Sequence, residues 1–107
     1  MQCEFIQQHH TLTARPAFTR LDAAIASEFM RACKHRLSDC SHLVIDLGRI
    51  EFIDSAGIGA LVAVLKGLGE AGRVTLVAPA RSVRTVFQMT RLDQVFHLVD
   101  HEAQVAA

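Results

Sequence analysis

The spacing of hydrophobic residues changes several times along the chain, and each change predicts a different element. Short, partly alternating segments at residues 3–8 and 11–14 predict two strands, and Pro16 should stop regular pairing after them. From residue 22 the spacing becomes helical, with Asp22 as the expected N-cap and an end near Ser38. The apolar face of this predicted helix consists of Ile25, Phe29, Ala32, Cys33 and Leu37.

Strands and helices alternate through the second half of the chain. Residues 42–47, H-L-V-I-D-L, form the nearly continuous apolar run of a central strand covered on both faces. Residues 50–53 are again extended and apolar, a helix should run from about residue 56 to 70, and residues 73–78 predict a third central strand. A third helix then carries its apolar face on Val83, Val86, Phe87 and Thr90, and residues 92–99 contain a last short strand before a weakly helical tail.

This alternation predicts the fold class. Crossovers that contain a helix are long enough to make neighbouring strands parallel, whereas the first two strands, joined by a short turn, should be antiparallel. We therefore expect an α/β fold with a mixed sheet of four to five strands and about four helices. The length and the apolar content suit one domain over residues 1–107.

Composition and charge weigh against several classes of function. The chain has 11 basic and 11 acidic residues, mixed along its length, so neither nucleic acid nor a charged membrane is an expected partner. Lys66, Gly67 and Gly69 interrupt the longest apolar run, and no signal-peptide pattern is present, which predicts a cytoplasmic protein without membrane insertion.

Cysteine and histidine spacing gives no reason to expect a metal site. The three cysteines lack the paired short spacing of zinc ligands and are expected to be reduced, with Cys33 in the core. The six histidines have no thiol or carboxylate at ligand spacing and are expected at the surface.

Asp54 and Ser55 lie where an apolar strand meets an apolar helix, in the segment E-F-I-D-S-A-G-I-G of residues 51–59. A serine in the first turn of a helix is near unpaired backbone N–H groups, and its hydroxyl should be exposed. Gly57 and Gly59 keep side-chain bulk away, which lets another molecule approach closely. The alternative is that Asp54 or Ser55 only caps the helix, since both residue types are favoured caps.

The two sides of the predicted helix at residues 56–70 differ in side-chain size. One side repeats at helical spacing and is the expected core stripe: Ile58, Leu61, Val62, Leu65 and Leu68. The other side is small and nearly uncharged: Ala56, Gly57, Ala60, Ala63, Val64 and Gly67. Small residues let a partner pack tightly, so we expect this side to bind another protein, unless a loop of the same chain covers it.

Two catalytic motifs fail on spacing. A serine-hydrolase elbow has glycine two residues before its nucleophile, where this chain has Ile53. The glycines at positions 57 and 59 match neither common phosphate-binding loop. We therefore expect neither an enzyme active site nor a cofactor.

The segments L-V-I-D-L, F-I-D-S-A-G-I-G-A-L, V-T-L-V and V-R-T-V-F-Q-M-T-R-L-D resemble the sulfate transporter and anti-sigma factor antagonist (STAS) domain. The resemblance is strongest to bacterial stand-alone anti-sigma factor antagonists and covers about residues 43–99, with a looser match from residue 21. The D-S-[SA]-G-[LI]-G motif is quite specific. One departure is A-F-T-R-L-D at residues 17–22, where the family often has a glycine shortly before Leu-Asp.

The resemblance implies a partner-switching role and its partners. In the family, an anti-sigma factor that is a serine kinase of the histidine-kinase-like ATPase type phosphorylates the serine after the aspartate, and a PP2C-type phosphatase removes the phosphate. Carried over, the phosphorylated residue is Ser55, and the unphosphorylated protein binds the anti-sigma factor. The expected partner-binding residues are Asp54, Ser55, Ala56, Gly57, Gly59, Ala60, Ala63 and Val64.

Two other classes of function stay open at this point. The chain could be a constitutive structural subunit, as are STAS subunits that brace the ATPase of lipid-transport complexes, and an enzyme is the third class. The serine at position 55 favours the switch over the brace, because a brace has no need of a phosphate acceptor.

Overall fold

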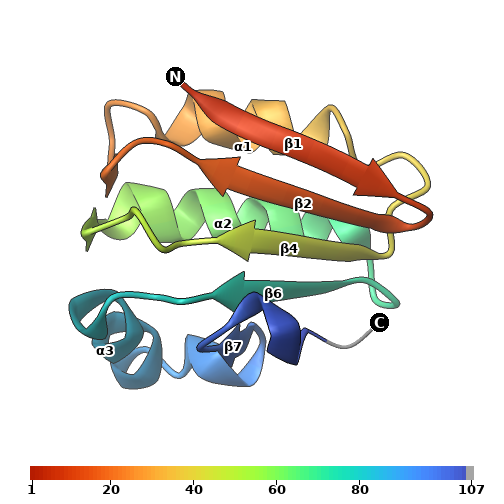
Figure 1. Cartoon of the computed structure of the whole chain (residues 1–107). Coiled ribbons are helices and arrows are strands. Elements are labelled where there is room, and N and C mark those ends of the chain that lie inside the picture. The colour runs from red at the N-terminus through yellow and green to blue at the C-terminus, as the bar shows by residue number, and fades with distance from the viewer. Residues whose placement is uncertain (106–107) are drawn as a thin grey trace.

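A computed structural model describes residues 1–105 and contains a five-stranded and a two-stranded sheet. The large sheet has the strand order β1-β2-β4-β6-β7 (Figure 1). Its strands are β1 (Cys3–Gln8), β2 (Thr11–Pro16), β4 (His42–Asp46), β6 (Arg73–Val77) and β7 (His97–Val99). The pair β1–β2 is antiparallel and the other pairs are parallel. The predicted α/β fold with a mixed sheet is confirmed.

Three α-helices lie between these strands in the chain and contribute to the core. They are α1 (Ala26–Lys34), α2 (Ser55–Leu68) and α3 (Arg81–Met89), and two single 3₁₀ turns follow, η1 (Leu92–Gln94) and η2 (Glu102–Gln104). Helices α1 and α2 lie side by side on one face of the sheet (Figure 1). Their buried side chains join those of the strands in one cluster that includes Phe29, Ile45, Leu61, Leu76 and Phe87. Cys33 belongs to this core, as predicted.

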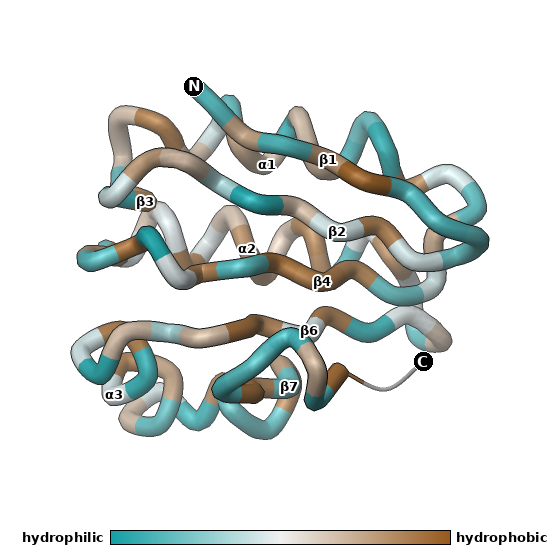
Figure 2. Tube along the Cα trace, viewed as in Figure 1, coloured by the Kyte–Doolittle hydropathy of each residue, from teal (hydrophilic) through white to brown (hydrophobic). Residues whose placement is uncertain are grey.

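Strand β4 lies in the sheet centre with hydrophobic residues along its middle (Figure 2), and its first four residues are buried. Its side chains alternate, so that Leu43 and Ile45 face the helices while His42 and Val44 face the other side. On that second face Val44, Val77 and Val99 form a small cluster against which Val105 packs. The predicted central strand is therefore confirmed.

The first helix is shorter than the sequence predicts, because Asp22 begins a turn rather than the helix. The Asp22 carboxylate accepts the backbone N–H of Ala24 at 3.1 Å, and its carbonyl oxygen accepts the N–H of Ala26 at 2.8 Å. The helix itself begins at Ala26, after Ile25 as N-cap, and ends at Lys34 rather than near Ser38. Asp side chains stabilise both turns and caps through the same local hydrogen bond, so the sequence signal does not separate them.

One histidine contradicts the prediction that all six lie at the surface. His42 is only 5% exposed, and its Nε2 lies 2.7 Å from the hydroxyl oxygen of Thr75. Burial, then the positive charge of Arg73 and the nearby His97, lower the pKa of His42 below the ordinary value of 6.5. Burial favours the neutral imidazole over the charged one. Thr75 provides the hydrogen-bond partner that a buried polar group needs.

A two-stranded parallel sheet of β3 (Arg20–Leu21) and β5 (Phe52–Ile53) lies apart from the main sheet and leads directly into α2. The extended conformation of residues 50–53 is predicted by sequence, but the pairing partner is not. Within residues 1–105, the helices are too short or too polar for a bilayer crossing.

Candidate functional site

Helix α2 begins immediately after Asp54, which is its N-cap. Asp54 has an extended backbone, and its Oδ1 accepts the N–H of Gly57 at 2.9 Å. Its other oxygen, Oδ2, accepts the N–H of Ala23 at 3.1 Å. One carboxylate therefore satisfies a free N–H of the first helical turn and also joins α2 to the turn before α1.

Because Asp54 caps the helix, the Ser55 side chain is not needed as the N-cap of α2. Ser55 is the first helical residue and is exposed. Within residues 1–105 its hydroxyl forms no hydrogen bond with the protein, whereas the cap bond uses the Asp54 carboxylate. The sequence left open whether Asp54 or Ser55 caps the helix, and the cap is Asp54. Ser55 has a free hydroxyl beside the positive end of the helix.

The Asp54 carboxylate is ionised at neutral pH. Hydrogen bonds from backbone N–H groups, that of Gly57 first, outweigh desolvation and lower the pKa of Asp54 below its ordinary value. The Asp54 carboxylate therefore stabilises the folded state at neutral pH. This stabilisation is lost in acid, as the pH falls through the lowered pKa and protonation breaks the cap. A negative group added to Ser55 would be attracted by the positive N-terminus of α2 and repelled by the Asp54 carboxylate.

The small-residue side of α2 is not open to a partner along its whole length, which corrects the sequence-based expectation. Ala60 is 5% exposed, Val64 is fully buried, and Gly57 is buried as well. Helix α1 packs along α2, and its residues Ala26 and Met30 line the groove beside Ala60. Gly57 lies against the backbone of β3, and Val64 belongs to the main core cluster. The same chain therefore covers these three residues, but with a helix, a strand and the core rather than with the loop that the predicted alternative named.

Gly57 is needed because the backbone of β3 lies against it. A Cβ atom at position 57 would lie 2.1 Å from the carbonyl oxygen of Leu21 and 2.8 Å from a side-chain carbon of Ile53. At Gly59, by contrast, a Cβ atom would meet no other atom within 4 Å. The two glycines of the motif thus have different roles, one internal and one at the surface.

The remaining predicted partner-binding residues form an accessible surface that starts at Ser55. We call it the Ser55 strip: Asp54, Ser55, Ala56, Gly59 and Ala63, all exposed or half-buried. Beside it lies a shallow groove between α1 and α2 with a volume of about 160 Å³. The groove is lined by Ala23, Ala26, Ser27, Met30, Ala56, Gly59 and Ala60, so small and apolar side chains surround one end of the strip.

We expect arginine to lower stability strongly at Ala60 but hardly at all at Ala63, three residues further along the same helix. Ala60→Arg should lower the free energy of unfolding by about 3 kcal/mol, because it forces a charge and extra volume between α1 and α2. Ala63→Arg should change it by less than about 0.5 kcal/mol, because the side chain can extend into solvent. Urea denaturation of both variants measures the difference, and equal losses would contradict the assigned faces of α2.

Arg20 and Phe52 form a second feature beside the site that sequence reasoning missed. Arg20 is exposed, its guanidinium carbon lies 4.1 Å from the centre of the Phe52 ring, and its Nε donates to Asp22 at 3.2 Å. Phe52 is 39% exposed, which is unusual for a large apolar side chain. The pairing of β3 with β5 brings residues 20 and 52 together, and the sequence does not reveal this pairing. The one sequence feature that could have indicated the contact is Phe52, an aromatic residue close to the Asp-Ser segment.

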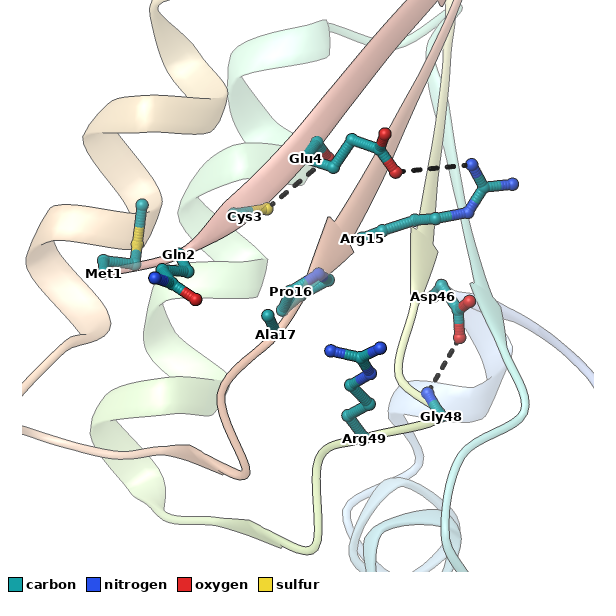
Figure 3. Close-up of a pocket in the computed structure, with 10 residues that line it drawn as sticks. All are labelled: Met1, Gln2, Cys3, Glu4, Arg15, Pro16, Ala17, Asp46, Gly48 and Arg49. Carbon is teal, nitrogen blue, oxygen red and sulfur yellow. Dashed lines mark hydrogen bonds and ion pairs between the residues drawn. The ribbon is translucent and has the colours of Figure 1, made fainter.

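A cavity of about 570 Å³ at the carboxyl ends of β2 and β4 has a polar lining that includes Arg15, Asp46 and Arg49 (Figure 3). Arg15 pairs with Glu102 at 2.6 Å and with Glu4 at 3.8 Å, and Asp46 accepts the N–H of Gly48 at 2.8 Å. Burial raises the pKa of the Cys3 thiol to about 11, so it is protonated and weakly nucleophilic at neutral pH.

Nothing within residues 1–105 assembles a metal site from three or more histidine, cysteine, aspartate or glutamate side chains. The cysteines Cys3, Cys33 and Cys40 are free thiols. Among the described features, the Ser55 strip is therefore the best candidate for function: a free hydroxyl on a rigid helix end, beside a small apolar groove.

Comparison with known proteins agrees with this geometry at the level of the family. The family model described as the STAS domain matches residues 6–105. Among solved structures, an anti-sigma factor antagonist from Mycobacterium paratuberculosis is similar, with a TM-score of 0.83 and 24% identity over 95% of this chain and 87% of that one.

Two further structures show how widely the fold is used. The Bacillus cell fate determinant SpoIIAA in its phosphorylated form has a TM-score of 0.73 and 22% identity, covering 95% of each chain. The murine anion transporter Slc26a9 matches with a TM-score of 0.75 and 17% identity over 92% of this chain but 17% of the transporter. At such identities the likeness is one of fold.

Proposed function

The chain belongs to the STAS domain family, and from this premise we propose that it is an anti-sigma factor antagonist whose binding is switched by phosphorylation of Ser55. The observation that carries the proposal is the free, exposed hydroxyl of Ser55 at the start of α2, next to an aspartate that already caps the helix. Similarity in fold to SpoIIAA, a protein with a phosphorylated form, supports it.

In the proposed cycle the unphosphorylated protein binds an anti-sigma factor through the Ser55 strip and the adjoining groove. The strip presents Gly59 and Ala63, whose small size permits close packing of a partner backbone. That partner is a serine kinase of the histidine-kinase-like ATPase type, and a PP2C-type phosphatase reverses its action. The protein itself acts by binding and carries out no catalysis.

Phosphorylation would release the partner through charge. A phosphate adds about −1.5 to −2 charges at neutral pH to a surface made mostly of glycine and alanine. The folded domain tolerates it, since the helix N-terminus favours an anion, while the Asp54 carboxylate limits the gain. In a tight contact the same phosphate must lose water without gaining a partner, which weakens binding.

A constitutive structural subunit is the second candidate, favoured by the match to a STAS region within the larger Slc26a9 chain. It predicts that Ser55 is never modified and that the same partner is bound at all times. The serine at position 55 favours the switch, because a structural subunit has no need of a phosphate acceptor.

Phosphate transfer tests the proposal directly. The kinase encoded in the same genome, incubated with ATP and the purified protein, should transfer one phosphate to Ser55, located by mass spectrometry. Ser55→Ala should abolish transfer. Ser82→Ala is the matched control, because Ser82 is also exposed in the first turn of a helix, α3, but does not follow a capping aspartate. Phosphorylation that persists in Ser55→Ala would refute the switch.

A further inference from the structure

A cluster of basic and hydroxyl side chains lies at the opposite end of the sheet from Ser55, at the first residues of the central strands. His42 begins β4, Arg73 begins β6, and His97 begins β7. Strand pairing aligns His42 with Arg73 and Thr75 with His97, so these four side chains share the face away from the helices. They line a cavity of about 220 Å³, here called the basic pocket.

The basic pocket has positive charge without an acidic partner among its lining residues. Arg73 and His97 are exposed, and within residues 1–105 neither takes part in an ion pair. The effect of Arg73 and of His97 on His42 is to lower its pKa, which is the effect of positive neighbours. The arrangement disfavours a metal cation, because Arg73 is always charged, and it favours an anion.

Three side chains can donate hydrogen bonds to an anion here. Arg73 offers the planar guanidinium fork that suits the oxygens of phosphate, sulfate or carboxylate. When His42 is protonated, its Nε2–H donates to the Thr75 hydroxyl oxygen 2.7 Å away, which leaves the Thr75 O–H free to donate into the pocket. His97 adds a second imidazole from the neighbouring strand.

We propose that the basic pocket of His42, Arg73, Thr75 and His97 is a binding site for a small oxyanion, and that binding is coupled to proton uptake by His42. This site is separate from the Ser55 strip and does not depend on the function proposed for it. An anion offsets the positive charge that disfavours protonation of His42, so binding raises the pKa of His42 and, by linkage, acid strengthens binding.

The charged and titratable groups around His42 come from three elements. Arg73 on β6 and His97 on β7 face it across the pocket. His10, in the turn between β1 and β2, contributes its carbonyl oxygen to the His42 N–H at 3.2 Å, while its ring Nδ1 lies 2.9 Å from the carbonyl oxygen of Asp39. The pH dependence is therefore assigned to His42, with Arg73 as a constant charge.

Sulfate is the appropriate probe because its charge is constant over the pH range in which histidines titrate. In ¹H–¹⁵N NMR titrations at constant ionic strength, with chloride as the balancing salt, sulfate should shift the signals of residues 42, 73, 75 and 97 saturably. We expect binding to be at least about tenfold tighter at about pH 6 than at about pH 8. Parallel titrations with phosphate and acetate identify which oxyanion geometry is preferred.

Variants separate the roles of the side chains. Arg73→Gln should weaken sulfate binding at least about tenfold at both pH values, and His42→Gln should remove the pH dependence. Arg31→Gln, which removes an exposed arginine on α1, is the matched control and should change neither. If His42→Gln does not fold, the NMR signals of the His42 ring in the wild type, followed across pH with and without sulfate, still test the coupling. Shifts that fail to saturate, or that persist unchanged in Arg73→Gln, would overturn the proposal.

Discussion

Gly57→Ala should destabilise the protein by about 2 kcal/mol or more, while Gly59→Ala, two residues further on, should stabilise it by about 0.5–1 kcal/mol. The new methyl group at position 57 would lie 2.1 Å from the backbone oxygen of Leu21, which cannot move without displacing β3 from β5. At position 59 the methyl group enters open space, and alanine favours the helix more than glycine does.

Thermal unfolding of Gly57→Ala and Gly59→Ala measures the difference in their stability. For a domain of this size 1 kcal/mol corresponds to about 4–8 °C, so the two variants should differ in Tm by more than about 10 °C. The two substitutions have the same chemistry within one helix, so a general effect of alanine cancels in the comparison. Equal Tm values would mean that β3 does not lie against α2 as described.

Ser55→Asp should weaken binding of the anti-sigma partner roughly a hundredfold, which corresponds to about 3 kcal/mol, and should leave the fold intact. The carboxylate brings negative charge to a strip where Asp54 is already ionised, and the residues of the Ser55 strip include no cation to pair with it. Ser55→Ala should bind like the wild type, because its hydroxyl has no protein partner.

Isothermal titration against the partner kinase, with a parallel unfolding curve for each variant, gives both quantities. Ser82→Asp places the same charge at the start of α3 and should bind as tightly as the wild type. Acidic variants at position 55 that bind as well as the wild type would leave Ser55 as an ordinary surface residue, and the structural-subunit alternative would then be the better account.

The central elements of the fold were predictable because their burial is continuous along the sequence. Strand β4 has three consecutive apolar residues at positions 43–45, and Val83 and Phe87 mark the buried face of α3 as predicted. The two-residue strands β3 and β5 were not predictable as a pair, since a period cannot be detected in two residues. His42 was missed for a related reason: its partner Thr75 lies 33 residues away.

The error on α2 has a different physical origin. A single hydrophobic stripe identifies the core face only when a helix has one neighbour, whereas α2 packs against α1 as well as the sheet. Ala60 is buried although it lies off that stripe, because it faces residues of α1. The position of Ser55 was predictable because a capping aspartate, a serine and a glycine follow a strand in an order that local chemistry explains.

The hydrogen bonds of Asp54 also determine what a modifying enzyme can recognise. The carboxylate joins Ala23 to the start of α2 across 31 residues of sequence, so the surface around Ser55 exists only after distant parts of the chain have come together. A peptide that contains the D-S-A-G-I-G motif has the acceptor hydroxyl but lacks this surface. A kinase that recognises the Ser55 strip therefore distinguishes mature molecules from nascent or unfolded ones, and the modified pool reports only on protein that has completed folding.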